Sequence, residues 1–203
     1  MDVFPCREAI LFTDKKLDTK SLKQSPRLSV VHNIRNMEQR ASAYDFFILS
    51  QLPSYVTTPH YLIVRTDGFI LNPEAWDDEF LKYHYIGAPW GYHPLNYCPP
   101  HQPVGPNTSV GSGGFSLRSR LLGMTTQGIF HEMSRQSGFA EQHWSPEDCF
   151  IARDIRPLLE TKGFRFAPES LAARFSCENK LYTNQFGFQG EDTLKMNPSI
   201  KQL

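Results

Sequence analysis

The most constraining feature of the sequence is an apolar run that ends in a carboxylate, between His60 and Pro73. Residues 61–64 are apolar and β-branched enough to predict a buried strand. Asp67-Gly68 then ends the strand, because glycine tolerates the backbone angles of a turn. An acid at the carboxyl end of a buried strand lies where open α/β sheets bind ligands, and it suits a hard cation or a sugar hydroxyl. The alternative is that Asp67 only caps the turn.

Composition narrows the class of protein. The chain has 203 residues, of which 40% are hydrophobic, and this favours a single domain with one sizeable core. A formal net charge of zero gives no electrostatic footprint for nucleic acid. No apolar span is long enough for a transmembrane helix, and the start of the sequence does not resemble a secretory signal. Four widely separated cysteines predict free thiols in a reducing cytoplasm rather than a zinc site or a disulfide framework.

The hydrophobic pattern alternates between strands and helices along the chain. Strands are expected at 8–13, 28–32, 61–65, 85–88, 113–117 and 164–167, and helices or helical turns at 36–52, 73–83, 118–125, 145–162 and 171–175. This alternation predicts an α/β fold with a mixed, largely parallel sheet flanked by helices. We expect residues 1–190 to form one domain and residues 191–203 to form a polar, loose tail.

A glycine-rich segment provides the second signal. Gly111, Gly113 and Gly114 fall within four positions, which lets the backbone approach a ligand closely. The segment lacks the lysine of a phosphate-binding P-loop, and it precedes a strand, whereas a dinucleotide fingerprint would follow one. An ordinary turn is the alternative.

A pair of acids provides the third signal. Glu147 and Asp148 follow Ser145-Pro146, a combination that opens helices. Acids at such a position are most often caps, because a carboxylate favours the positive end of a helix. The alternative is a general base whose carboxylate faces a reacting group.

Taken in order, these signals resemble a known family. The series is Thr66-Asp67-Gly68, Ile-Gly-Ala-Pro-Trp at 86–90, Gly-Ser-Gly-Gly-Phe-Ser-Leu-Arg at 111–118, Pro-Glu-Asp at 146–148 and Phe-Ala-Pro at 166–168. It resembles a family of bacterial and fungal glycosyltransferase-like domains of largely unassigned function. The resemblance implies a GT-A-like (Rossmann-like), mainly parallel sheet. It also implies a hexosyltransferase-type enzyme that moves a sugar from a nucleotide-diphosphate donor to a hydroxyl acceptor, in cell-surface polysaccharide or glycoconjugate synthesis.

The resemblance also implies roles for residues on the donor side. Asp67 would contact the metal or the donor, with Mn²⁺ or Mg²⁺ offsetting the charge on the diphosphate. Gly113, Gly114 and Phe115 would form the floor of the sugar pocket. Thr13-Asp14, after the first strand, would contact the nucleobase and ribose, although an ordinary polar strand end is equally compatible with the pattern.

On the acceptor side, Glu147 or Asp148 would deprotonate the acceptor hydroxyl, and we favour Asp148 as the base. The aromatic rings of Trp90 and Tyr92 are candidates for stacking on an acceptor sugar. Packing of a proline-rich loop onto the sheet is the alternative for both rings.

Three departures from the family pattern favour a second hypothesis. The acidic motif is Thr-Asp-Gly rather than Asp-x-Asp, so only Asp67 can be matched. Gln189 stands where the family pattern has a histidine, and glutamine is a poor Mn²⁺ ligand. Residues 1–7 resemble the end of a helix, so the first strand of such a fold would be missing and its edge covered by a loop or a second copy of the chain. The alternative function is therefore a non-catalytic or truncated nucleotide-sugar-binding domain.

Overall fold

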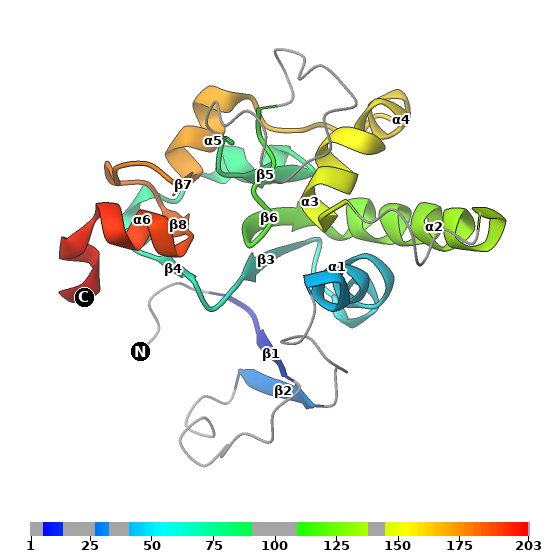
Figure 1. Cartoon of the computed structure of the whole chain (residues 1–203), viewed down its shortest axis with the longest axis horizontal. Coiled ribbons are helices and arrows are strands. Elements are labelled where there is room, and N and C mark those ends of the chain that lie inside the picture. The colour runs from blue at the N-terminus through cyan, green and yellow to red at the C-terminus, as the bar shows by residue number, and fades with distance from the viewer. Residues whose placement is uncertain (1–5, 14–26, 33–40, 91–108, 138–144, 203) are drawn as a thin grey trace.

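The computed structural model describes residues 6–13, 27–32, 41–90, 109–137 and 145–202, which form three small sheets with helices around them (Figure 1). The first sheet is the parallel pair β1 (Ala9–Thr13) and β2 (Leu28–His32). In Figure 1 this pair lies apart from the other two sheets. Both strands have the bounds that their apolar patterns predict, to within one residue.

The other two sheets each have three strands. One has the order β3-β6-β5 and is antiparallel throughout, with β3 at His60–Val64, β5 at Tyr85–Gly87 and β6 at Phe115–Ser119. The other has the order β4-β8-β7, with β4 at Gly68–Ile70, β7 at Ser176–Glu178 and β8 at Gly187–Gln189. Strand β8 pairs antiparallel with β4 and parallel with β7.

The expectation of a mainly parallel, Rossmann-like or GT-A-like sheet is therefore wrong. Parallel neighbours need a crossover of a dozen or more residues, usually a helix. Between β3 and β5 the chain forms only β4 and the short 3-10 helices η3 (Pro73–Ala75) and η4 (Asp78–Lys82). Strand β6 then enters between β3 and β5 in the opposite direction to both, so the alternation of strands and helices did not determine the pairing.

The helices surround these sheets. Besides η3 and η4, the described helices N-terminal to Glu147 are α1 (Ala41–Ser50), η2 (Leu52–Tyr55) and α2 (Arg120–Ser137). The segment expected as one helix over 145–162 divides into α3 (Glu147–Cys149), the π-helix η6 (Phe150–Asp154) and α4 (Arg156–Thr161). Pro157 explains the last division, because proline has no N–H to continue a helix and fits the first turn of a new one.

The C-terminal part is more ordered than its composition predicts. Helix α5 spans Glu169–Phe175, and the expected strand at 164–167 is reduced to an isolated bridge between Tyr85 and Phe166. The expected loose tail forms α6 (Glu191–Met196) and the 3-10 helix η7 (Pro198–Gln202). Ile200 of η7 is buried with Cys177 and Phe188, which ties this segment to the third sheet.

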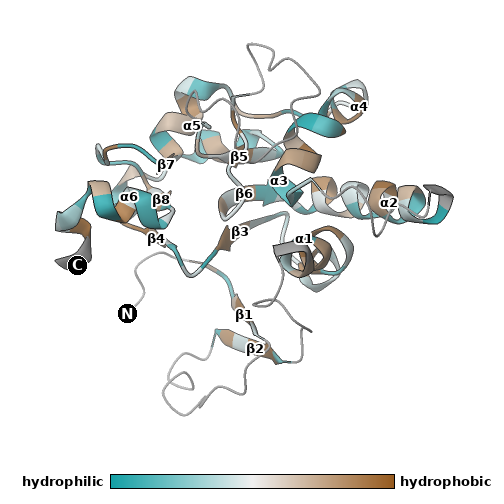
Figure 2. Cartoon of the chain, in the orientation of Figure 1, coloured by the Kyte–Doolittle hydropathy of each residue, from teal (hydrophilic) through white to brown (hydrophobic). Residues whose placement is uncertain are grey.

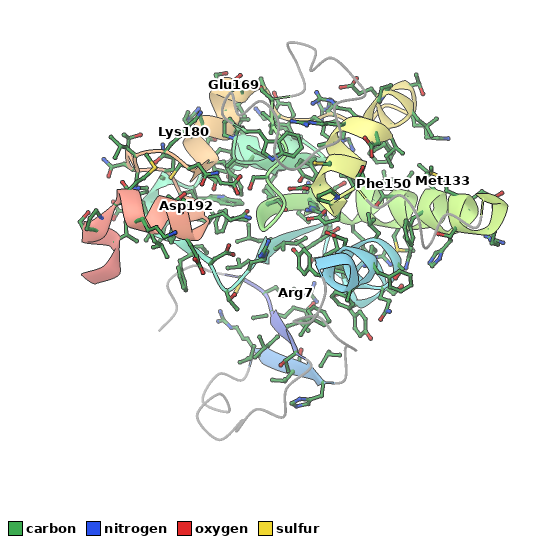
Figure 3. The ribbon with its side chains drawn as sticks, viewed as in Figure 1. Arg7, Met133, Phe150, Glu169, Lys180 and Asp192 are labelled. Carbon is green, nitrogen blue, oxygen red and sulfur yellow. The ribbon has the colours of Figure 1, made fainter. Side chains whose placement is uncertain are left out.

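Aromatic side chains dominate the core. Phe80, Phe115, Phe175 and Phe186 are fully buried, and their ring centroids lie 5.2–5.9 Å apart in the contacting pairs. A second cluster joins α2 to η6, and Figure 3 shows its members Phe150 and Met133 at that junction. Figure 2 shows polar and apolar residues alternating along α2, as expected for a helix with one buried face.

The cysteines only partly follow the prediction. Cys6 and Cys177 are free thiols, whereas Cys149 is disulfide-bonded, so the expectation of free thiols throughout is wrong. Among the described residues, no helix is long and apolar enough to cross a membrane. Residues 1–5 lie outside the described part, so the expected helix end and missing first strand stay predictions.

Candidate functional site

Residues Gly111–Gly114, called the glycine loop from here on, connect the Pro89–Val110 bridge to β6. All four residues are buried. The N–H groups of Gly111 and Ser112 donate to the carbonyl of Ala88, at 3.4 and 3.3 Å. Tyr85 Oη, which is buried, donates to the Gly111 carbonyl at 2.5 Å. The loop is therefore fixed by hydrogen bonds to the strand beside it rather than being a loose turn.

Side chains from distant segments converge on the glycines. A Cβ atom on Gly113 would lie 2.1 Å from Glu147 Oε1, and one on Gly114 would lie 2.5 Å from Arg65 Cδ. A Cβ atom on Gly111 would lie 2.1 Å from the Trp90 ring. Real Cβ atoms do not approach so closely, so the loop needs glycine at these positions. Protein side chains thus fill the space beside these glycines, and the approach of a ligand to this backbone stays a prediction.

Beneath the loop lies a buried ion pair between Arg118 and Glu147. The guanidinium forms two contacts with the carboxylate, Nη1 to Oε2 at 2.7 Å and Nη2 to Oε1 at 2.9 Å. The two side chains are only 1% and 3% exposed. Arg118 also donates to the Gly113 carbonyl at 3.3 Å, and its Nε donates to Ser116 Oγ at 2.9 Å. Both Glu147 oxygens are thus held by Arg118, which suits a support for the loop rather than a base.

Asp148, the next residue, faces the loop. Its Oδ2 accepts a hydrogen bond from the Gly113 N–H at 3.1 Å, and its Oδ1 accepts one from Cys149 N–H at 2.8 Å. The residue as a whole is half-buried. Burial, followed by the negative charge of Glu147, raises the pKa of Asp148 to about 7. A carboxyl that exchanges its proton near neutral pH is suited to general acid–base chemistry.

A second carboxylate, Glu178, lies near Asp148, and a third, Asp67, lies near Glu178. Burial raises the pKa of Glu178, and the charge of Asp67 raises it further. Glu178 in turn contributes to the raised pKa of Asp148. Asp67 follows β3 as predicted, and its Oδ1 lies 3.5 Å from Arg65 Nε. Glu178 thus lies within electrostatic range of both Asp67 and Asp148.

The donor atoms around the loop do not fit a divalent cation. Gln189 Oε1, at a position where the sequence resemblance predicts a histidine, accepts hydrogen bonds from Ser112 Oγ at 2.7 Å and from the Phe115 N–H at 2.8 Å. Asp67 is paired with Arg65, a cation that competes with a metal for the same oxygen. Within the described residues, no three His, Cys, Asp or Glu side chains are grouped so that they could hold a metal ion.

The remaining predicted residues are dispersed. The Phe115 ring is buried against Phe175 and Phe186, so its backbone rather than its side chain contacts the site. The Trp90 ring covers Gly111 and stacks with Arg153, whose Cζ lies 4.2 Å from the ring centroid.

Three further residues were predicted for the donor and acceptor sides, namely Thr13, Asp14 and Tyr92. Thr13 ends β1 in the separate two-stranded sheet. Asp14 and Tyr92 lie outside the described residues.

A pocket of about 650 Å³ lies elsewhere on the molecule. Its walls come from η3, η4, α5 and residues 183–185, and none of the predicted site residues lines it. Its Asp77 carboxylate accepts a hydrogen bond from the Glu79 N–H and is ion-paired with Arg174, and these contacts lower the pKa of Asp77. An acid held ionised in this way is a cap and not a proton carrier.

Four residues of the site were missed from the sequence. Tyr44, Arg65, Arg153 and Glu178 come from α1, the end of β3, η6 and β7. No local motif marks Tyr44, Arg153 or Glu178. Arg65 adjoins the Thr66-Asp67-Gly68 motif, and an arginine at the end of a buried strand was the one available signal.

Comparison with known proteins yields one match. A family model described as "Protein of unknown function (DUF5672)" matches residues 28–190. The chain belongs to this family. The matched range begins with β2 and ends at Gly190, so it includes the glycine loop, Asp67, Asp148 and Gln189. No curated protein and no solved structure matches the chain.

Proposed function

We propose that this protein transfers a sugar from a nucleotide-diphosphate donor to a hydroxyl acceptor, with Asp148 as the general base. The observation that carries the proposal is Asp148 itself. Its carboxyl is hydrogen-bonded to the glycine loop, and its pKa is raised to about 7. The motif series that resembles glycosyltransferase-like domains supplies the reaction class, and Asp148 supplies the chemistry that such a reaction needs at neutral pH.

Proton removal from a hydroxyl requires a base that is ionised yet still attracts a proton. A carboxyl with an ordinary pKa near 4 is ionised but weakly basic at pH 7, whereas one with a pKa of about 7 combines both properties. Glu147 supports this role indirectly, because its negative charge raises the pKa of Asp148 by more than the Arg118 charge lowers it. Asp148 is therefore the base in this proposal, and Glu147 is a positioning residue.

The surroundings of Asp148 are compatible with a sugar ligand. Asp67 is a strand-end acid of the type that accepts hydrogen bonds from sugar hydroxyls, and it is paired with Arg65, which lies beside Gly114 of the loop. The Trp90 ring is covered by Gly111 and by the Arg153 guanidinium, so this proposal does not use it for the acceptor stacking expected from the sequence. In this proposal the donor lies beside the loop and the acceptor hydroxyl lies at Asp148.

The non-catalytic alternative is a domain of the same fold that binds the donor without turning it over. The hydrogen bonds to Gln189 favour it, because they occupy the oxygen that would replace the family's histidine as a ligand. The cytoplasmic location expected from the sequence stays a prediction. The disulfide bond of Cys149 argues against it, since structural disulfides persist in oxidising compartments.

A screen of nucleotide sugars, read as release of the nucleoside diphosphate, tests the proposal. Asp148→Asn should lose most turnover while binding the donor as tightly as the wild type. Asp192→Asn, which alters an exposed acid of α6 paired with Lys195, is the matched control and should keep full activity. Binding without turnover in the wild type would favour the non-catalytic alternative, and full turnover in Asp148→Asn would reject Asp148 as the base.

A further inference from the structure

Three buried polar atoms around the glycine loop have no hydrogen-bond partner among the described residues. They are Tyr44 Oη, Arg153 Nε and Asp67 Oδ1. Buried polar groups in folded proteins are almost always hydrogen-bonded, so each exception calls for an explanation. Tyr44 Oη and Arg153 Nε are donors, whereas Asp67 Oδ1 is an acceptor with Arg65 Nε 3.5 Å away. A ligand that supplies acceptor oxygens would satisfy the two donors.

Two guanidinium groups lie at opposite ends of the loop. Arg65 adjoins Gly114, because its N–H donates to the Gly114 carbonyl at 2.8 Å and its Cδ occupies the space beside Gly114 Cα. Arg153 adjoins Gly111 through the Trp90 ring, which lies between them. Gly111 and Gly114 are three residues apart, so at most about 10 Å of backbone separates them, and each arginine side chain is long enough to extend toward a ligand between them.

Tyr44 belongs to the same cluster. The Arg65 guanidinium lies 5.3 Å from the Tyr44 ring centroid. The charges of Glu147, Arg118, Arg65 and Asp148 all act on the Tyr44 hydroxyl, which places it near the Asp148 side of the loop. Its pKa is raised by burial, so the hydroxyl stays protonated and remains a donor.

The chemistry of these donors selects phosphate. A guanidinium binds phosphate oxygens through its planar fork of N–H groups, and it is less strongly hydrated than an ammonium. The Arg65–Asp67 pair engages Nε, and a guanidinium has further N–H donors. Asp148, at a pKa of about 7, is about half protonated at neutral pH and opposes an anion less than an ordinary carboxylate would.

We propose that Arg65 and Arg153 hold the diphosphate of the donor from the two ends of the glycine loop, that Tyr44 Oη donates to it, and that these groups offset its charge without a divalent cation. The identity of the ligand as a donor diphosphate rests on the proposed function. The site itself rests on the orphaned donors, on the two guanidiniums and on a donor set that does not suit a metal.

Binding of inorganic pyrophosphate in EDTA, measured by calorimetry, tests the site without requiring turnover. The wild type should bind, and added Mn²⁺ should change the dissociation constant less than twofold beyond its effect on free pyrophosphate. Arg65→Gln and Arg153→Gln should each weaken binding tenfold or more. Arg135→Gln, an exposed arginine of α2 whose side chain is 75% exposed, is the control and should bind as the wild type does.

Tyr44→Phe separates a ligand contact from a structural one. The variant loses a hydroxyl that has no hydrogen-bond partner in the described part of the chain, so its melting temperature without ligand should be unchanged or higher. Its affinity for pyrophosphate should fall several-fold. A lower melting temperature together with unchanged affinity would assign the hydroxyl a structural role and remove it from the site.

The outcomes distinguish this inference from the proposed function. Pyrophosphate binding in EDTA with no turnover of any nucleotide sugar would keep the site and reject the transferase. Turnover that needs Mn²⁺, without pyrophosphate binding in EDTA, would keep the transferase and reject the site. Unchanged affinity in both arginine variants, or no binding by the wild type, would also reject it.

Discussion

The carboxylate of Glu147 is bound by both terminal nitrogens of Arg118, at 2.7 and 2.9 Å, in a pair that is almost completely buried. The Glu147 N–H donates to Asp45 Oδ1 at 3.0 Å, so α1, α3 and β6 meet at this carboxylate. Asp148 is the next residue in the chain, so the buried pair also fixes the position of Asp148. Glu147 therefore anchors the site, whereas the Asp148 carboxylate faces the glycine loop.

Glu147→Gln should destabilise the fold strongly. It would leave the Arg118 charge buried without its counterion, and breaking a buried pair in this way costs about 3–5 kcal/mol. Denaturant unfolding measures the loss. Glu132→Gln is the control, because its pair with Arg135 lies on the surface and should contribute less than about 1 kcal/mol. An effect of Glu147→Gln as small as that of the control would show that the pair does not hold the loop.

The raised pKa of Asp148 predicts a pH-dependent stability. The folded protein keeps this proton up to about pH 7, whereas the unfolded chain loses it near the ordinary value of about 4. Between these values the folded state binds more protons, so this group makes the free energy of unfolding fall as the pH rises. Asp45, whose pKa is raised to about 6, acts in the same direction over the lower part of this window.

Asp148→Asn isolates the contribution of Asp148. The difference in unfolding free energy, variant minus wild type, should increase from about pH 4 to about pH 7 and then level off. If the protein is a transferase, kcat/KM of the wild type should rise through about pH 7 as the base ionises. A difference that stays constant across this range would mean that Asp148 has an ordinary pKa.

Two glycine substitutions should have opposite effects on the stability of the fold. Gly113→Ala would place a Cβ atom 2.1 Å from Glu147 Oε1, in the middle of the buried pair, and should lower the melting temperature markedly. In Gly128→Ala the new Cβ meets nothing within 4 Å, and α2 should gain about 0.5–1 kcal/mol because alanine favours the helix. Equal effects of the two substitutions would contradict the packing described for the loop.

The sequence predicted secondary structure better than it predicted which segments lie side by side. The bounds of β2 follow from its apolar run, because burial of a strand leaves a local pattern. The direction of pairing leaves no such pattern, and β6 was placed in a parallel sheet although it runs antiparallel to both neighbours. The contact between Ser112 and Gln189 joins residues 77 positions apart, and no local motif indicates it.

The electrostatics of Asp148 show the same limit. From the sequence, the start of a helix at residue 145 predicts a lowered carboxylate pKa. In the structure α3 has only three residues, so its dipole is small, and burial beside Glu147 raises the pKa instead. The pair of acids could be recognised from the sequence, but their separate roles depend on Arg118, which reaches them from another strand.

Gln189→His tests the meaning of the departure from the glycosyltransferase-like pattern, in which a histidine is expected at this position. Gln189 Oε1 accepts from both Ser112 Oγ and the Phe115 N–H, whereas a neutral imidazole has one acceptor nitrogen. At least one donor would lose its partner, at a cost of about 1–3 kcal/mol in unfolding free energy. Gln51→His, at an exposed position before η2, is the control and should stay within about 0.5 kcal/mol of the wild type.

The same variant tests whether the site can bind a divalent metal ion. If the glutamine has replaced a metal ligand in an otherwise intact site, restoring the histidine should make Mn²⁺ raise the melting temperature by several degrees. Because Asp67 is paired with Arg65, we expect no such shift in Gln189→His. Stabilisation by Mn²⁺ in the variant and not in the wild type would show that the wild-type site lacks one side chain needed to bind a cation. It would also overturn the proposal that Arg65 and Arg153 offset the charge of the diphosphate without a divalent cation.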